Sequence, residues 1–467
     1  MPQQQRPRSV PADLWSRPDL RDACRALDVG AILRAYRRHT GLSQQRVGEI
    51  VDIPQSAVSE YENRVHRATT VAVIARVAAG LDIPSDLLPL VPPPSDGRHA
   101  PTAAWGPAHI VEELDRATRG DLMLGRRELV EGAAAAGGAL VNPLRRWLTQ
   151  GSTALPHGTS SGISPDELAH LAVTATAFRT WDVQYGGGLR RKAVIGQLNE
   201  VVDHLRDPHP AAAQAELYRI TADLAETAGS VLWDIGQHQR AQTYYTLGVK
   251  AAAQAGDPAL AAHILATMAV QCVELGHLRT GLDLVQMAQH TVRDVEMPRL
   301  DSMLATREGW ICAQLGRIQD THRAIGTAED AFARTAPGDA PTWLGYFTAA
   351  ELAGTTASDY RDLAVHDRGQ LARSADRFER SLALRGTDSP RSTAFDLTEL
   401  AKIRLRQGDV EQACTTGHAA VDAATGLHSF RVRQRLSELF DATTPYRHIT
   451  PCADLRERVA PLARATI

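Results

Sequence analysis

The feature that most constrains this chain is an apolar helical segment that ends in glycine and recurs about every 40 residues. The segments GSVLWDIG, AVQCVELG, GWICAQLG and AKIRLRQG end at Gly236, Gly276, Gly316 and Gly408. A glycine at the end of a helix readily takes the left-handed conformation that lets the chain turn back. Repeats of this length are typical of helical hairpins that stack on one another. The sequence therefore predicts an α-solenoid over much of its length.

Small residues flank these glycines on both sides and recur with the same period. Those before the glycines are Gly229, Ala269, Gly309 and Ala401, and those after them are Gly248, Ala288, Ala328 and Ala420. Small side chains at these places let two antiparallel helices approach closely. The interval from Gly316 to Gly408 is roughly two periods, so we expect a degenerate hairpin around residues 356–384. Another hairpin is expected in residues 168–205, with its turn at the glycines of residues 186–188.

Residues 225–252, AETAGSVLWDIGQHQRAQTYYTLGVKAA, resemble a unit of the tetratricopeptide (TPR) family in its longer-period bacterial form. The family positions are filled by Gly229, Gly236, Ala241 and Tyr245. In two other copies, Gly281 and Thr321 replace the alanine that matches Ala241. The resemblance covers most of residues 163–440. It implies an extended concave surface that binds a peptide, a small molecule or a protein partner.

Four tryptophans are candidates for lining a ligand groove on that surface. They are Trp181, Trp233, Trp310 and Trp343. Aromatic residues at repeat positions are more often part of the core than of a binding surface, so both interpretations stay open.

Few segments alternate β-branched and polar residues, so the chain is predicted to be all-α. Stretches rich in proline, glycine and serine divide it into parts. The expected parts are a flexible arm (1–19), a five-helix domain (20–90), a linker (91–108), a helical connector (109–150), a second linker (151–162) and the TPR-like array (163–467).

Residues 41–64, GLSQQRVGEIVDIPQSAVSEYENR, have the pattern of two short helices around a sharp turn. Ser43 can cap the first helix, and Gly48 lets another helix cross close to it. In the second helix, Val58 and Tyr61 are expected to face inward. Polar side chains then face outward at Gln55, Ser56, Ser59 and Glu60. A short polar face beside such a turn is the geometry that enters the major groove of DNA, where glutamine pairs with adenine, serine with several bases and glutamate with cytosine.

The same stretch resembles the Cro/repressor-type (XRE family) helix-turn-helix through the pattern GLSQ…QS…EN. The resemblance extends from about Asp28 to Leu88. It implies base reading by Gln55, Ser56 and Glu60 and phosphate contacts from Gln44, Ser59 and Asn63. It also implies a structural ion pair between Arg37 and Glu62.

Two positions depart from that family pattern, because Asp52 and Arg64 stand where glycines are usual. Both positions favour a turn or left-handed backbone, which Asp52 and the adjacent Asn63 can adopt at some cost. A helical bundle that had lost DNA binding would keep the apolar positions. It would not need the polar set of Gln44, Gln55, Ser56 and Asn63 together. We therefore expect intact DNA binding.

The composition limits other classes of function. A formal net charge of -3 excludes a protein that coats nucleic acid through a basic surface all around, although it permits local contact with DNA. Five scattered cysteines without a C-x-x-C pair suit reduced thiols, so neither a metal site nor a cofactor is expected. GTSSG at residues 158–162 matches the serine-hydrolase pattern G-x-S-x-G, but it lies in a linker instead of between a strand and a helix. No catalytic residue is assigned, and an enzyme is not expected.

Together the two resemblances imply a bacterial HTH–TPR transcriptional regulator, cytoplasmic and associated with the nucleoid. Its expected partner is a double-stranded DNA operator, and no membrane partner is expected. A homodimer is expected because one short recognition helix gives modest affinity, which two half-sites together raise. The alternative is a TPR-type interaction scaffold in which DNA binding is secondary or lost.

Overall fold

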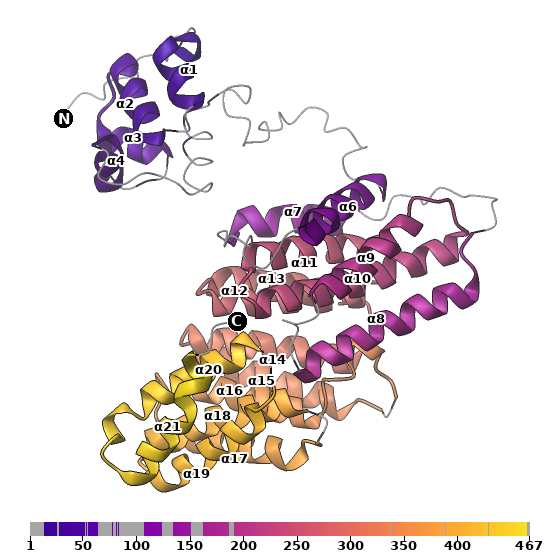
Figure 1. The fold of residues 1–467 in the computed structure, drawn as a ribbon, viewed down its shortest axis with the longest axis vertical. Coiled ribbons are helices and arrows are strands. Elements are labelled where there is room, and N and C mark those ends of the chain that lie inside the picture. The colour runs from indigo at the N-terminus through magenta and orange to yellow at the C-terminus, as the bar shows by residue number, and fades with distance from the viewer. Residues whose placement is uncertain are drawn as a thin grey trace. The chain divides into compact units, whose positions relative to one another are not determined.

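A computed structural model describes residues 14–25, 28–51, 53, 55–63, 77, 81, 83, 107–123, 134–150, 162–185, 191–336, 338–387, 389–427 and 429–464. Contacts within the chain form two compact units, Met1–Thr102 and Ala103–Ile467. All regular elements in the described ranges are helices, which confirms the predicted all-α class (Figure 1).

The first unit contains a short 3-10 helix and four described α-helices. They are η1 (Leu14–Ser16), α1 (Pro18–Arg25), α2 (Val29–Thr40), α3 (Gln44–Val51) and α4 (Gln55–Glu62). Their apolar faces meet in one core, to which Val77, Leu81 and Ile83 also contribute. Apart from those three residues, residues 64–106, where the fifth helix of the expected five-helix domain would begin, lie outside the described residues.

Residues 14–19, expected to belong to a flexible arm, are part of this folded unit. Leu14 is fully buried in the core and α1 already begins at Pro18. The polar, proline-rich residues around Leu14 and Trp15 hid their role, because two adjacent apolar residues carry no periodic signal. The expected boundary at residue 19 is therefore too late.

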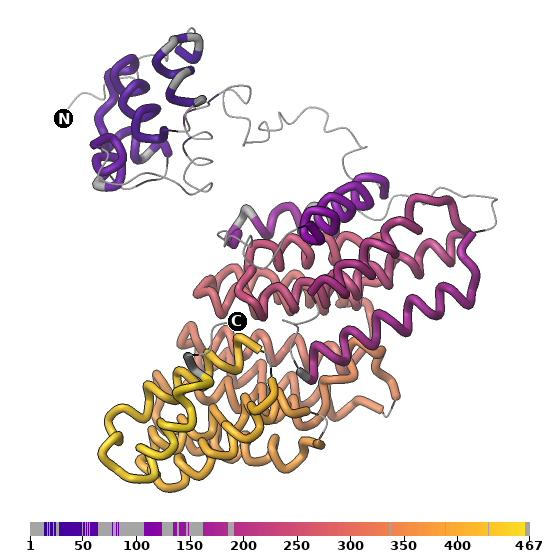
Figure 2. The backbone as a smooth tube through the Cα atoms, viewed as in Figure 1, coloured from indigo at the N-terminus to yellow at the C-terminus, as the bar shows by residue number. Residues whose placement is uncertain are grey.

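The second unit is built from paired helices. Its first elements are α6 (Pro107–Met123), α7 (Gly138–Gln150), α8 (Pro165–Tyr185), α9 (Arg191–His204), α10 (Ala211–Asp234), α11 (His238–Gln254), α12 (Pro258–Glu274) and α13 (Leu278–Thr291). Then follow α14 (Pro298–Gln314), α15 (Ile318–Ala333), η4 (Thr342–Leu344), α16 (Ala349–Leu363), α17 (Gln370–Leu384), α18 (Pro390–Gln407), α19 (Val410–Ala424), α20 (Phe430–Ala442), η5 (Thr444–Tyr446) and α21 (Thr450–Arg464). The hairpins run from α10–α11 to α20–α21, and Figure 2 traces the backbone through them.

The repeated glycines turn the hairpins as the sequence predicted. Gly236, Gly276, Gly316 and Gly408 have φ of 80°, 83°, 71° and 91°, a region that side-chain-bearing residues rarely adopt. The degenerate hairpin expected around residues 356–384 corresponds to α16 and α17. The last hairpin, α20 and α21, was not recognised from the sequence.

Close packing between paired helices depends on the small residues. A Cβ at Gly229 of α10 would lie 2.5 Å from the ring of Tyr245 on α11. A Cβ at Gly281 of α13 would lie 2.6 Å from Val273 of α12. The side chain of Val273 therefore occupies the space that an alanine methyl group would need at position 281. These contacts confirm that small residues bring the two helices of a hairpin together.

A cluster of charged residues joins hairpins that are far apart in the sequence. Both carboxylate oxygens of Asp234, at the end of α10, accept hydrogen bonds of 2.7 Å from Arg391 of α18. Arg431 of α20 also donates to Asp234, at 2.9 Å, and its guanidinium lies over the ring of Trp233. Arg391 donates in addition to the backbone oxygen of Asp182 on α8, at 3.0 Å. We call Asp182, Asp234, Arg391 and Arg431 the Asp234 cluster.

The described part of the chain lacks two further features. None of its helices is long and apolar enough to cross a membrane. No group of three or more His, Cys, Asp or Glu side chains within it is placed to hold a metal ion.

Candidate nucleic-acid interface and ligand cleft

The helices of the first unit have well-defined ends. Asp28 caps α2, where its side chain accepts a hydrogen bond from the Ala31 amide at 2.9 Å. Gly41 ends the same helix with φ of 71°. Ser43 then accepts a hydrogen bond of 3.1 Å from the Arg46 amide, as expected for a cap of α3. Only two residues, Gly41 and Leu42, therefore separate α2 from the cap of α3.

Gly48 makes the tight turn between α3 and α4 possible. A Cβ at this position would lie 2.5 Å from the carbonyl oxygen of Ile53 and 3.6 Å from a methyl group of Val58. The Ile53 amide in turn donates to the Gly48 oxygen at 2.9 Å. The closest neighbour is thus the backbone of the turn itself, and not another helix as the sequence suggested.

Four side chains form a continuous series of polar contacts from α2 to the start of α4. Glu62, only 5 % exposed, accepts from Arg37 Nη1 at 2.6 Å and from Gln44 Nε2 at 2.7 Å through the same oxygen. The amide oxygen of Gln44 then accepts from Gln55 Nε2 at 3.0 Å. We call these residues the Glu62 chain. It fixes the orientation of Gln55, an exposed residue in the first turn of α4.

The remaining expected DNA contacts also lie on or beside α4. Glu60 is exposed, Ser59 is partly buried, and Asn63 follows the end of the helix. Asn63 Nδ2 donates to Ser59 Oγ at 3.3 Å, which brings these two expected phosphate ligands together. Ser56 lies in α4, but its side chain is outside the described part of the structure, as are Asp52 and Arg64.

Two residues that sequence reasoning missed hold α4 against α2. Arg34 Nη1 donates to the backbone oxygen of Glu62. A Cβ at Gly30 would lie 2.1 Å from the backbone oxygen of Tyr61, so only glycine fits between these helices. Arg34 lies one helical turn before Arg37 on the same face of α2, and that spacing was the available signal.

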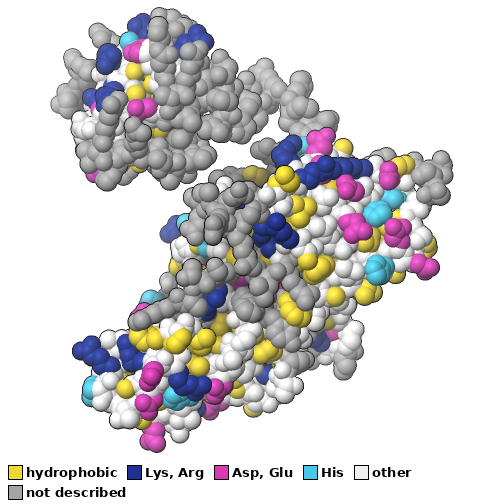
Figure 3. All heavy atoms as spheres, viewed as in Figure 1, with side chains coloured by type: hydrophobic (Ala, Val, Ile, Leu, Met, Phe, Trp, Pro, Cys, Tyr) yellow, Lys and Arg dark blue, Asp and Glu magenta, His cyan; other side chains and the backbone are white. Residues whose placement is uncertain are grey.

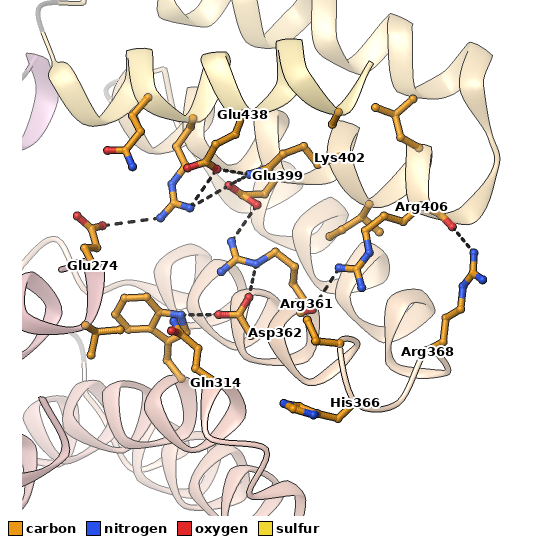
Figure 4. A pocket seen from close by; sticks show the side chains of 18 of the residues that line it. Glu274, Gln314, Arg361, Asp362, His366, Arg368, Glu399, Lys402, Arg406 and Glu438 are labelled. Atoms are coloured by element: carbon orange, nitrogen blue, oxygen red, sulfur yellow. Dashed lines mark hydrogen bonds and ion pairs between the residues drawn. The ribbon is translucent and has the colours of Figure 1, made fainter. Parts of the chain in front are cut away.

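The second unit contains an open cleft of about 960 Å³ (Figure 4). Its polar and charged side chains come from α12, α14, α16, α18, α20 and the connection from α16 to α17. Those labelled in Figure 4 are Glu274, Gln314, Arg361, Asp362, His366, Arg368, Glu399, Lys402, Arg406 and Glu438. Val273, Trp310 and Ile403 add apolar surface. The cleft therefore offers both charge and apolar area to a ligand.

Most charges in this cleft are paired within the protein. Glu399 contacts Arg361 at 2.9 Å and Lys402 at 2.7 Å. Burial alone would raise the pKa of Glu399, but Arg361, Lys402 and Arg435 outweigh burial and hold that pKa well below its usual range. Arg368 and Arg406, in contrast, donate only to backbone oxygens of the protein and contact no carboxylate in the described residues.

The four tryptophans do not line one common groove. Trp233 and Trp343 are buried, whereas Trp181 is 37 % exposed. Trp310 lines the open cleft and donates from Nε1 to Asp362 at 2.9 Å. The core interpretation therefore fits Trp233, the cleft holds Trp310, and Trp343 borders a different cavity.

Acidic and basic side chains are interspersed over the visible face of the second unit (Figure 3). This mixture is consistent with the near-neutral composition and gives no broad basic face in that view.

Residues 33–88 match the family model described as helix-turn-helix. The match contains α3, α4 and all four members of the Glu62 chain, so the first unit carries an XRE-type helix-turn-helix domain, a DNA-binding type. The paired helices of the second unit fit a repeat domain. A comparison with curated proteins finds no match.

Proposed function

We propose that this chain is a sequence-specific transcriptional regulator whose second unit senses a ligand or partner. The observation that carries the proposal is the Glu62 chain. It connects a partly buried ion pair to Gln55 and so presents the Gln55 amide in a fixed orientation at the start of α4. A fixed amide loses little conformational freedom on binding, which favours direct reading of a base edge.

In the proposed complex, α4 enters the major groove of an operator. Gln55 donates one amide hydrogen to Gln44, which leaves its second amide hydrogen and its oxygen for adenine. Ser56 and Glu60 read neighbouring bases. Gln44, Ser59 and Asn63 contact phosphates and set the position of the helix on the duplex.

The regulator acts as a homodimer in this proposal. One helix of eight residues reaches few bases, whereas two copies on two half-sites combine their binding free energies. The second unit is a TPR-like array in the cytoplasm, and its ligand changes operator affinity by favouring one arrangement of the protein over another.

The test is selection of DNA by the purified full chain from a random duplex library. We expect a motif with two half-sites that are inverted or directly repeated. The double variant Gln55→Ala/Ser56→Ala should lose or relax the motif, with affinity for the best site falling about tenfold or more, because each good base contact contributes about 1–3 kcal/mol.

Gln45→Ala provides the matched control. Gln45 is an exposed glutamine of α3 that lies next to Gln44 but outside the Glu62 chain. This variant should select the same motif as the unaltered protein. Salt-sensitive binding without a motif, unchanged in the double variant, would contradict sequence-specific reading.

That outcome would favour the second candidate, an interaction scaffold. The open cleft supports this alternative, because Arg368 and Arg406 remain available to an acidic partner beside apolar surface. A scaffold would keep its partner when the base-reading residues are replaced.

A further inference from the structure

A second cavity in Ala103–Ile467, of about 440 Å³, has the size and lining of a small-molecule site. It lies between α8, the segment from η4 to the start of α16, and the connection from α17 to α18. Val183, Trp343, Tyr346 and Leu384 give it apolar and aromatic walls, and Thr180 lies at its edge on α8. It shares no lining residue with the open cleft of Figure 4.

Arg179 is the unusual member of this lining. Its side chain is more than nine-tenths buried, and Nη2 donates to Asp223 on α10. Nε and Nη1 are buried and have no hydrogen-bond partner among the residues that the structure describes. An unpaired buried donor is destabilising, so the fold alone gives no reason to keep two of them on a residue that lines a cavity.

The charges around the cavity indicate what kind of group would meet those donors. The charge of Arg385 is balanced by two carboxylates, since it donates to Asp396 at 2.6 Å and to Glu351 at 3.0 Å. Arg179 is already balanced by Asp223. Both arginines of the lining are thus paired with carboxylates, so a carboxylate ligand would add negative charge beside Asp223 and Glu351. An uncharged acceptor oxygen has no such cost.

We propose that this cavity binds an uncharged, largely apolar small molecule whose carbonyl oxygen accepts hydrogen bonds from Nε and Nη1 of Arg179. The proposal deepens the sensor role proposed for the second unit and rests on it for its biological meaning. The aromatic walls take the apolar body of the ligand, and Arg179 fixes its orientation.

A ligand in this cavity would contact early and late parts of the array at the same time. Its walls come from α8 on one side and from η4, α16 and the α17–α18 connection on the other. These segments are more than 150 residues apart in the sequence, and the Asp234 cluster joins the same early and late parts of the array. A bound ligand therefore favours the arrangement in which these parts are together.

The experiment compares two probes of nearly equal size with the full chain. Benzophenone carries a carbonyl oxygen between two rings, whereas diphenylmethane lacks that oxygen. Calorimetric titration should show benzophenone binding about tenfold or more tighter, because only benzophenone accepts hydrogen bonds from a charged donor. Near-ultraviolet light attaches benzophenone to adjacent C–H groups, and the labelled peptides should come from α8 and from residues 342–351.

Two variants and a control assign that preference to the cavity. Arg179→Lys keeps a cation for Asp223 but removes the planar fork, and should abolish the preference for the carbonyl probe. Thr180→Trp fills the cavity from an exposed position on α8 and should abolish labelling. Val173→Trp adds the same side chain at an exposed position of α8 outside the cavity and should change neither result.

Equal affinity for the two probes, or labelling that persists in Thr180→Trp, would overturn the proposal. So would tighter binding of 4-benzoylbenzoate than of benzophenone, since a preferred carboxylate contradicts the charge argument. None of these readouts involves DNA. A chain that binds the carbonyl probe but selects no operator would therefore contradict the proposed regulatory function without contradicting the proposed ligand site.

Discussion

Glu226, a buried carboxyl on α10, makes the stability of the second unit depend on pH. Burial raises its pKa to about 7, although Arg179 acts in the opposite direction. Among the described residues, its only hydrogen bond is from Thr267, at 3.3 Å. The folded pKa lies above the usual value of 4.5, so the folded state holds a proton that the unfolded state releases. The contribution of Glu226 to stability is therefore present at low pH and is lost as the pH rises through about 7.

We predict that Glu226→Gln removes this loss. Between pH 6 and pH 8, the free energy of unfolding should fall about 1–2 kcal/mol more for the unaltered protein than for the variant, because glutamine cannot ionise. Denaturant titrations of both proteins at the two pH values measure the difference. The matched control is Glu112→Gln at an exposed position of α6. Equal pH dependence in the unaltered protein and Glu226→Gln would show that Glu226 does not titrate in this range.

At the scale of single helices, two interior glycines should respond in opposite ways to alanine. Gly196 of α9 has open space where a Cβ would be, whereas Gly229 of α10 faces the Tyr245 ring at 2.5 Å. Both gain about 0.5–1 kcal/mol of helix propensity from alanine. We expect Gly196→Ala to stabilise the protein by about that amount.

Gly229→Ala should instead destabilise the protein by about 1–3 kcal/mol, because the two helices must move apart or Tyr245 must leave its position. Thermal unfolding of the two variants and the unaltered protein shows whether each substitution raises or lowers stability. Stabilisation by Gly229→Ala would mean that α10 and α11 adjust freely, contrary to the close packing described above.

The same elements show what the sequence could and could not predict. The period of the hairpins was readable because Gly236, Gly276 and Gly316 mark each turn by a backbone requirement that few other residues meet. The turn from α16 to α17 has no such glycine, and residues 364–369 close it through backbone hydrogen bonds and the Asp367 side chain. Its place had to be inferred from the spacing alone.

The expected DNA-reading residues were found through a local pattern, since α3 and α4 are adjacent in the sequence. The bond between Gln44 and Gln55 and the contact of Gly48 with the turn depend on the exact path of the backbone, which the pattern does not specify. Long-range contacts were still less accessible. Neither the thiols of Cys414 and Cys452, 2.9 Å apart, nor the pairing of Asp234 with Arg391 leaves any trace in a single sequence.

At the scale of the whole second unit, the Asp234 cluster alters how the array should unfold. In an open array each hairpin contacts only its neighbours, so the ends can unravel separately. Here Asp234 of α10 is bonded to Arg391 and Arg431, which are 157 and 197 residues further along the chain. We therefore predict that the early and late hairpins unfold together.

Asp234→Asn should separate them, because it leaves one buried and one partly buried guanidinium group without their shared carboxylate, at a cost of about 3–5 kcal/mol. Hydrogen exchange across a denaturant series should show one cooperative unit spanning α10 to α20 in the unaltered protein and two units in the variant. The surface variant Asp294→Asn is the control and should leave the single transition within about 0.5 kcal/mol. Two units in the unaltered protein would contradict the prediction.

The pairing of Asp234 with Arg391 and Arg431 also limits how the length of such a chain can change during evolution. An open array tolerates duplication or deletion of a whole hairpin, because the new neighbours meet through equivalent surfaces. One hairpin more or fewer between α10 and α18 would move Arg391 and Arg431 a full repeat away from Asp234 and leave buried charges unmatched. A single carboxylate thus fixes the copy number of the hairpins, and inherited insertions should accumulate in the connections between helices.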